Sequence, residues 1–452
     1  MASDLTKGSV MGPLVRFTVP LVLGNLFQLT YNAADSIMVG QFVGKDALAA
    51  VGAAAPVMNI IMFLVAGACL GAGVLMSEFF GAGSREVLRR EVGTALTAGL
   101  AFTLVLSAVC AAFAPQLLRL TQVPAALLEQ STVYLRVICA ALGFTFLYNL
   151  YAAALRAVGD SKTPLVFLIL SCCLNICANY ILIVPMGLGV LGAALGTAIA
   201  EGASAVLCVG YVCLKNPVLH LQWKDLRPRR ELLGRTLRYS WATAMQQAAL
   251  YVGKLLVQSC VNRLGVDVIA AFNAVNRIDD FAYTPMQNIA HAMTTFIAQN
   301  RGAGQYGRIR AGFRAACRLE VGYWAILALC VPLFSRQLMA LFVDEQEVIA
   351  VGASYLVLMG LFYLMPAFTN WIQGYFRGMG NMRITVISTS VQMIFRVLFT
   401  FLLAPGRGLP GIAWAQMGGW AAMMIYEVPA LGRALREVQA MASGQMPASA
   451  EH

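Results

Sequence analysis

The sequence predicts an all-α integral membrane protein with twelve transmembrane helices in two six-helix lobes that are related by a parallel internal repeat. Three observations support this fold class. Hydrophobic residues make up 59% of the 452 residues and charged residues only 12%, whereas soluble domains carry about 25% charged residues. Twelve apolar stretches have the length of a membrane span, and the two halves of the chain match each other at one constant offset.

The apolar stretches are the predicted transmembrane helices, because a helix of about 20 apolar residues crosses a bilayer. They lie at 15–40, 47–77, 92–114, 132–155, 164–186, 190–214, 237–262, 268–298, 312–334, 349–374, 384–404 and 409–432. Several exceed the thickness of a bilayer, so we expect them to tilt, bend or project into water. Asp4 and Lys7 lead directly into the first stretch, which argues against a cleavable signal.

The two halves match when the sequence is shifted by 221 residues, a shift that pairs Gly81 with Gly302 and Tyr134 with Tyr355. An even number of spans in each half gives both halves the same orientation in the membrane. This parallel plan occurs in transporters that bind substrate between their halves. The predicted domains are an N-terminal lobe (1–214), a cytoplasmic linker (215–236), a C-terminal lobe (237–432) and a cytoplasmic tail (433–452).

The basic residues indicate topology rather than a nucleic-acid partner. Of the 32 Lys and Arg residues, 23 lie in the two termini, with Arg16 counted there, and in the alternate loops at 85–90, 156–162, 215–238, 301–318 and 377–383. The positive-inside rule places these loops and both termini in the cytoplasm. We therefore expect a multi-pass protein of the inner (cytoplasmic) membrane, with the lipid bilayer as its surroundings.

A polar stripe in the first span contains the most informative residue, Asp35. Asn25, Gln28, Asn32 and Asp35 are spaced three, four and three residues apart, which places them on one face of a helix. Unpaired polar groups are costly in lipid, so this face should meet protein or water, and a carboxylate there indicates function. Pro20, further back in the same helix, permits a kink.

The fifth and sixth spans carry matching stripes. Ser171, Asn175 and Asn179 follow one another at steps of four, and Thr197 and Glu201 are four apart. Together with the first span, these helices offer side-chain oxygens from three directions. Such a set is suited either to a proton relay or to a hard cation.

The second half carries stripes that include charges. The stripe of the seventh span consists of Gln247, Tyr251, Lys254 and Gln258, and that of the eighth consists of Asn276, Asp280, Tyr283, Gln287 and His291. Arg396 lies inside the eleventh span. One interpretation is internal pairing of Lys254 or Arg396 with Asp279 or Asp280, and the other is contact with substrate.

Nothing in the sequence indicates an enzyme or a bound cofactor. The chain has three histidines and eleven cysteines. Cys172, Cys173 and Cys177 cluster without a His or a second Cys pair at metal-binding spacing, so we interpret them as packing residues. A membrane-embedded transferase, the alternative from a different class, would require convergent carboxylates, histidines or a metal set.

The order of several stretches resembles the multidrug and toxin extrusion (MATE) family over residues 12 to 432. These stretches are "YNAADSIMVG", "ALRAVGDSKTP", "LNICANYILI" and "TFIAQNRGAG". The resemblance implies a V-shaped, monomeric antiporter that opens to one side at a time. It would export amphipathic, often cationic compounds in exchange for H⁺ or Na⁺.

The resemblance also assigns roles. Asp35 matches the family's acid in the first helix, and Pro20 matches the proline at which that helix bends. Asn175, Asn179 and Thr197 match its proton- or cation-linked partners, and with Asp35 they would be the metal ligands if Na⁺ is the coupling ion. The candidate cavity residues are Asn25, Gln28, Asn32, Tyr148, Gln247, Tyr251, Lys254, Asp280, Tyr283, Gln287 and Arg396.

Two departures from the family keep alternatives open. Asn179 stands where an Asp is common, which weakens a Na⁺ site. The second half lacks acids that some members carry on the seventh and tenth helices, so the resemblance is to the branch that couples through its N-terminal half. Lys254 is also unexpected in an exporter of cations. Lys254 and Arg396 suit the rival function, a lipid-linked saccharide flippase that holds a pyrophosphate.

Overall fold

The computed structural model describes residues 4–443, and every regular element in that range is a helix. The helices are α1 (Met11–Phe42), α2 (Lys45–Gly81), α3 (Arg85–Ala112), α4 (Ala114–Leu120), α5 (Ala125–Ala157), α6 (Lys162–Ile183), α7 (Gly189–Lys215), the 3-10 turn η1 (Trp223–Leu226), α8 (Arg230–Val261), α9 (Val266–Gly302), α10 (Tyr306–Leu333), α11 (Ser335–Ala340), α12 (Gln346–Phe362), α13 (Leu364–Gly378) and α14 (Met382–Ala442). The end of the predicted tail, residues 444–452, lies outside the described residues.

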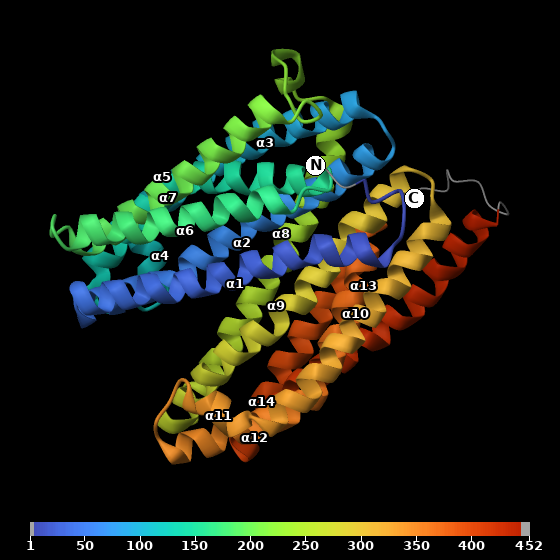
Figure 1. The fold of residues 1–452 in the computed structure, drawn as a ribbon. Coiled ribbons are helices and arrows are strands. Elements are labelled where there is room, and N and C mark those ends of the chain that lie inside the picture. Colours follow the sequence, from blue (N-terminus) through green and yellow to red (C-terminus); the bar gives the residue numbers. More distant parts are fainter. Residues whose placement is uncertain (1–3, 444–452) are drawn as a thin grey trace. The chain divides into compact units, whose positions relative to one another are not determined.

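Two compact units make up the chain. Unit 1 comprises Met1–Asp4 and Val19–Gln247, and unit 2 comprises Leu5–Thr18 and Ala248–His452. Helices α1 and α8 each contribute residues to both units. Unit 1 is built on α5, which packs against α2, α3 and α7, while α6 packs on α7 (Figure 1). In unit 2, α9 packs against α10, α12 and α13, and α14 packs against α10, α12 and α13.

The helix bounds repeat at the offset that the sequence predicts. Helices α2 and α9 both have 37 residues, and Lys45 and Val266, where they begin, are one offset apart. Helices α3 and α10 both have 28 residues. Helix α5 corresponds in the second half to the pair α12 and α13, which is bent by 47° at its break. The duplicated sequence thus forms the same succession of helices twice.

Glycines in the left-handed region end the equivalent helices. After α2, Gly83 has φ +70°, and the amide of Ser84 donates to the carbonyl of Phe79 at 3.1 Å. After α9, Gly304 has φ +69°, and the amide of Gln305 donates to Asn300 at 2.8 Å. This is the usual glycine C-cap of a helix, because glycine adopts positive φ without steric cost.

Within residues 4–443, seven helices are long and apolar enough to cross a membrane, or eight when α12 and α13 count as one broken span. Helices α1, α8 and α9 are also long but do not pass this test, and each carries a polar stripe; α6 and α7 carry stripes as well and do pass it. Helix α14 covers the last two predicted spans, and its backbone leaves the helical region at Gly408, between them. The count of twelve predicted spans therefore exceeds the number that pass a test of length and hydropathy.

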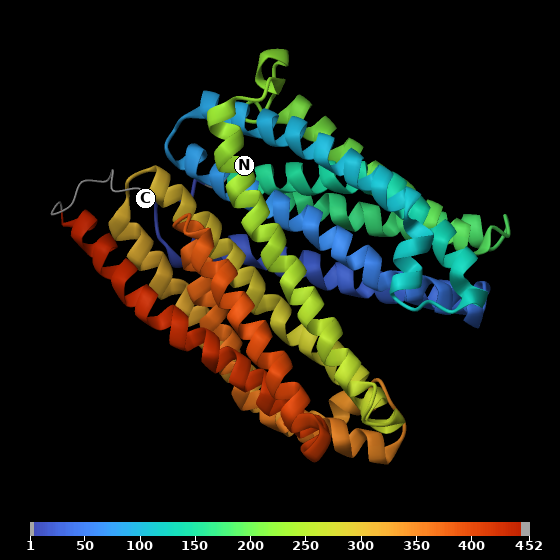
Figure 2. The ribbon, with the colours of Figure 1, turned by 180° about the vertical axis from the view of Figure 1, so that it is seen from behind.

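The linker is partly helical, unlike the loop expected at 215–236. Helix α8 begins at Arg230, and η1 packs against α3 beside it (Figure 2). The carboxylate of the buried Asp225 accepts from the amide of Gln222 at 2.9 Å, which closes the turn. Hydropathy locates the apolar part of a helix, and a helix can continue past it into water.

Candidate functional site

Asp35, Asn179, Asn175 and Thr197 form one continuous hydrogen-bonded chain within unit 1. Nδ2 of Asn179 donates to Oδ1 of Asp35 and also to Oδ1 of Asn175, the latter at 2.9 Å. Nδ2 of Asn175 donates to Oγ1 of Thr197 at 3.3 Å, and that hydroxyl donates to the carbonyl of Ala193 at 3.1 Å. The structure therefore brings together the four side chains that the sequence singled out for ion coupling.

Along this series of hydrogen bonds, the side chains become more buried from Asp35 to the two amides. Asp35 is half-buried, whereas Asn175 and Asn179 are 1% and 0% exposed. Oδ1 of Asn179 is buried and accepts no hydrogen bond from any described residue. The Asp35 carboxylate is thus the accessible end of the series, and the buried amides behind it include one oxygen, Oδ1 of Asn179, that accepts no hydrogen bond.

A glycine of α7 makes room for the Asn179 amide. A Cβ on Gly196 would overlap the Oδ1 of Asn179. Helix α7 can therefore approach α6 at the level of the site only because position 196 has no side chain. The sequence stretch "LGAALGTAIA" is rich in small residues, but its pattern alone does not indicate which glycine adjoins the site.

Two tyrosines near Asp35 were not among the predicted site residues. The Tyr31 side chain interacts electrostatically with Asp35. Tyr134, which is 3% exposed, also interacts electrostatically with Asp35. The sequence repeat pairs Tyr134 with Tyr355, so this match could have drawn attention to Tyr134, whereas no such pattern marks Tyr31.

The remaining candidates of the first half are more dispersed. Asn25 is half-buried, whereas Gln28 and Asn32 are exposed. The hydroxyl of Tyr148 donates to the carbonyl of Pro164 at 3.2 Å. Pro20 lies inside α1, one residue after the position at which the chain passes from unit 2 to unit 1.

In unit 2, Lys254 pairs with Asp280. The distance from Nζ to Oδ1 is 3.1 Å, and the two side chains are 55% and 40% exposed. An ion pair this accessible contributes little to stability, about 0.2–1 kcal/mol. The pairing interpretation is therefore supported by geometry, but Lys254 is not the buried charge that its place inside a span suggested.

Asp279, the neighbour of Asp280, lies in a buried polar cluster. It accepts a hydrogen bond from the hydroxyl of Tyr355 at 2.9 Å and another from Tyr363 at 2.5 Å. Arg396 is 8% exposed and interacts electrostatically with Asp279. Tyr283 packs edge-on against Tyr363, with ring centroids 5.4 Å apart. Its hydroxyl accepts from Gln416 at 2.5 Å.

Among the remaining cavity candidates of the second half, Gln247 and Tyr251 are half-buried, and Gln287 is exposed.

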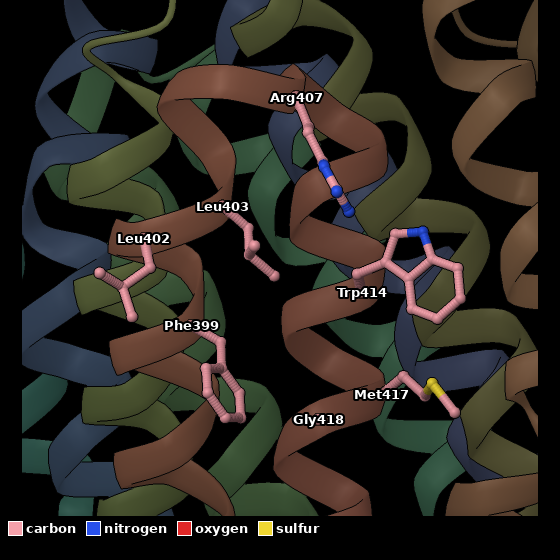
Figure 3. Close-up of a pocket in the computed structure, with 7 residues that line it drawn as sticks. All are labelled: Phe399, Leu402, Leu403, Arg407, Trp414, Met417 and Gly418. Carbon is pink, nitrogen blue, oxygen red and sulfur yellow. The ribbon is translucent and has the colours of Figure 1, made fainter.

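A groove between the two arms of α14 is separate from both polar clusters. It is lined by Phe399, Leu402, Leu403, Arg407, Trp414, Met417 and Gly418 (Figure 3). None of these residues is a candidate site residue, and Arg407 is the only charged one. An apolar surface of this kind on a membrane-spanning helix suits lipid chains better than a polar ligand.

Comparisons with known proteins agree with the sequence resemblance. The model of the family described as MatE matches residues 20–181 and 242–402. A probable multidrug resistance protein of Bacillus subtilis, YoeA, is 29% identical over 399 residues, which are 87% of this chain and 85% of that protein. The multidrug export protein MepA of Staphylococcus aureus is 23% identical over 411 residues, 91% of each chain.

Solved structures show the same fold. A structure described as MATE in the bent conformation superimposes with a TM-score of 0.88 at 22% identity, and the alignment covers 97% of this chain and 98% of that one.

Proposed function

The chain belongs to the MatE family, and from this premise we propose that it is a secondary active antiporter that exports amphipathic, cationic small molecules in exchange for protons. The relatives are transporters rather than enzymes, and the apolar helices of this chain suit a multi-pass membrane protein. Export of drugs is supported by the names of these relatives, a probable multidrug resistance protein and a multidrug export protein. That the exported compounds are amphipathic cations is part of the proposal.

The proposed architecture is two six-helix lobes, residues 1–214 and 237–432, joined by the segment 215–236 and followed by the tail 433–452. The repeated helix bounds support it, as do the two segments matched by the family model. If α12 with α13 forms one span and the arms of α14 form two, each half supplies six. We propose that the lobes alternate access across the cytoplasmic membrane, as a monomer with both termini in the cytoplasm.

The observation that carries the proposal is the hydrogen-bonded chain from Asp35 to Thr197. An ionised carboxylate only accepts hydrogen bonds, whereas a protonated one also donates. Asn179 has a donor and an acceptor on the same amide, and its Oδ1 is unused while its Nδ2 donates to Asp35. Rotation of the amide would present Oδ1 to a protonated Asp35. The site is therefore suited to both charge states of the carboxylate.

This geometry favours a proton over Na⁺ as the coupling ion. A hard cation is held by several oxygens that point at it. Here the group nearest to Asp35 is an amide that donates N–H, and only one of the four residues can be negatively charged. Uptake of a proton would change the contacts of α1 with α6 at Asp35. Pro20 lies in the same helix, where a missing hydrogen bond makes bending cheap.

The experiment is export of a fluorescent cation measured in inverted membrane vesicles, with a pH gradient and a sodium gradient imposed separately. We expect the pH gradient alone to drive accumulation. Asp35→Asn mimics only the protonated state, so it should reach the membrane folded and lose uphill transport. Asp46→Asn, which removes an exposed carboxylate at the start of α2, is the matched control.

Two results would contradict the proposal. Uphill transport by Asp35→Asn at the wild-type rate would reduce Asp35 to a structural role. Transport driven by a sodium gradient without a pH gradient would show that Na⁺, not H⁺, is the coupling ion. Asp35, Asn175, Asn179 and Thr197 would then be tested as Na⁺ ligands.

A further inference from the structure

Asp279 in unit 2 is a buried carboxylate whose two oxygens each accept one phenol hydroxyl. Asp279 is 4% exposed. Oδ2 accepts from Tyr355 at 2.9 Å and Oδ1 from Tyr363 at 2.5 Å. Both tyrosines are almost completely buried, at 1% and 0% exposure. A carboxylate with a separate donor on each oxygen is bound as an anion, although its partners are neutral.

The cations of unit 2 leave this carboxylate without a direct ion pair. Lys254 pairs with Asp280 at 3.1 Å. Arg396, on α14, interacts electrostatically with Asp279, but among the described residues it forms no ion pair within 4.0 Å. Its buried Nε also has no hydrogen-bond partner there. Two buried charges therefore face each other without direct contact, an arrangement that costs free energy unless one of them can be neutralised.

The repeat supplies an independent reason to regard this site as functional. Tyr355 is the repeat partner of Tyr134, and Tyr134 interacts electrostatically with Asp35 in unit 1. In each half, the equivalent tyrosine therefore interacts with a carboxylate. The carboxylates themselves come from non-equivalent helices, α1 and α9. The sequence repeat therefore predicts the tyrosine but does not predict Asp279.

The position of Tyr363 would connect the site to the shape of a span. Tyr363 is the residue between α12 and α13, where the pair is bent by 47°. Its hydroxyl bonds Asp279 of α9, and its ring packs against Tyr283, whose hydroxyl accepts from Gln416 of α14. The Asp279 carboxyl is thus hydrogen-bonded directly to the residue at the break.

We propose that Asp279 is a second proton-binding carboxyl, located in the other unit from Asp35. A hydronium ion transfers its proton to one Asp279 oxygen and leaves as water, and the tyrosine bonded to that oxygen gives up its donation. Release of the proton to water restores both hydrogen bonds. A metal cation does not suit this site, because the two hydroxyl hydrogens and Arg396 all present positive charge to the carboxylate.

The titratable and charged groups around Asp279 come from several elements. Arg396 of α14 interacts electrostatically with it, and the hydroxyls of Tyr355 and Tyr363 donate to it. Its neighbour Asp280 pairs with Lys254 of α8. Tyr283, the remaining titratable neighbour, lies on the same helix as Asp279. The protonation itself does not depend on the proposed function, whereas its use in transport rests on that function.

The test is infrared difference spectroscopy of the full chain in lipid nanodiscs, titrated over the pH range in which the protein stays folded. We expect a protonated-carboxyl band in wild type and in Asp35→Asn that is lost in Asp279→Asn. The other buried carboxyls cancel in the difference between the spectra. Identical carboxyl bands in wild type and Asp279→Asn at every pH would overturn the proposal and leave Asp279 as a structural partner of Arg396.

Two tyrosine variants keep the test valid if Asp279→Asn does not fold. Tyr355→Phe and Tyr363→Phe each remove one hydrogen bond from the ionised carboxylate and keep the carboxyl group. The midpoint of the band's titration should move to higher pH in both, and a midpoint that does not move would contradict the proposal. Loss of uphill transport in Asp35→Asn is scored separately, so failure of the proposed function and failure of the second proton site give different results.

Discussion

Asn179 is the residue that most distinguishes the candidate site of this chain. Its amide donates to both Asp35 and Asn175 and leaves its own Oδ1 unused. An aspartate at this position would place a second negative charge beside Asp35, and like charges disfavour joint ionisation. With an amide at position 179, only the Asp35 carboxylate carries a negative charge, and one proton neutralises it.

The smallest change that tests the amide is Gly196→Ala. The added Cβ would overlap Oδ1 of Asn179, so the amide must turn away from Asp35 or α7 must shift. We expect a folded protein that loses proton-driven export, although neither Asp35 nor Asn179 has been altered. Export of a fluorescent cation and thermal stability in detergent are measured on the same preparation.

Gly202→Ala, on the same helix, is the matched control. Its Cβ would lie 3.6 Å from the Phe144 ring, an ordinary contact, so export should be unchanged. Wild-type export by a folded Gly196→Ala protein would show that the amide contact is dispensable.

At the scale of elements, the packing of α8 on α2 depends on glycines. Cβ atoms on Gly67 and Gly71 would lie 2.7 Å from the backbone of Ala244 and 2.5 Å from that of Tyr239. Thr243 uses this close approach to donate to the carbonyl of Gly67 at 2.5 Å, and Ser240 donates to Ala68 at 2.8 Å. Small residues that let helix backbones approach, with hydroxyls that bond across, are typical of helix association in membranes.

Gly71→Ala should therefore destabilise the protein. Within a helix, Ala is ordinarily more favourable than Gly by about 0.5–1 kcal/mol. At position 71, however, the methyl group meets the carbonyl of Tyr239, and overpacking costs about 1–3 kcal/mol. The measurement is the thermal unfolding midpoint in detergent. In the control Gly210→Ala, nothing lies within 4 Å of the new Cβ. Equal midpoints for the two variants would rule out close packing of α2 and α8.

At the scale of the whole molecule, duplication relates the halves of the chain without making their chemistry equal. The same helix bounds and glycine caps occur in both. The repeat partner of Asp35, however, is Leu256, and that of Asp279 is Met58. Duplication therefore repeats the scaffold, while the charged groups are specific to each half.

The topology of the duplicated chain predicts that the loops after α2 and α9 lie on the same side of the membrane, the cytoplasmic side. Ala82 and Ala303 are repeat partners in these loops. In a background in which the exposed Cys173, Cys177 and Cys213 are replaced by Ala, cysteines at 82 and 303 should react with a membrane-impermeant thiol reagent only from the cytoplasmic side. Labelling of the two positions from opposite sides would rule out the parallel repeat.

Hydropathy and the repeat predicted most of the scaffold. The helical class is confirmed over residues 4–443, and the family by a match to both halves. The spacing of Asn175 and Asn179 on one helix face, together with the family resemblance, singled out a site whose four side chains now prove to be bonded in series. Their roles in coupling stay a prediction.

The partners of each polar face were decided by the tertiary structure. Spacing along a helix determines which residues share a face, but what that face meets depends on packing with distant segments. The stripe placed Lys254 on a polar face of its span, and only packing shows that it is exposed and paired with Asp280. The cluster around Asp279 depends on the break between α12 and α13, which places Tyr363 against α9. The sequence by itself determined the helical class and the family of the chain, because both depend on composition and local pattern. Packing decided which charges are buried together, because the partners come from distant segments.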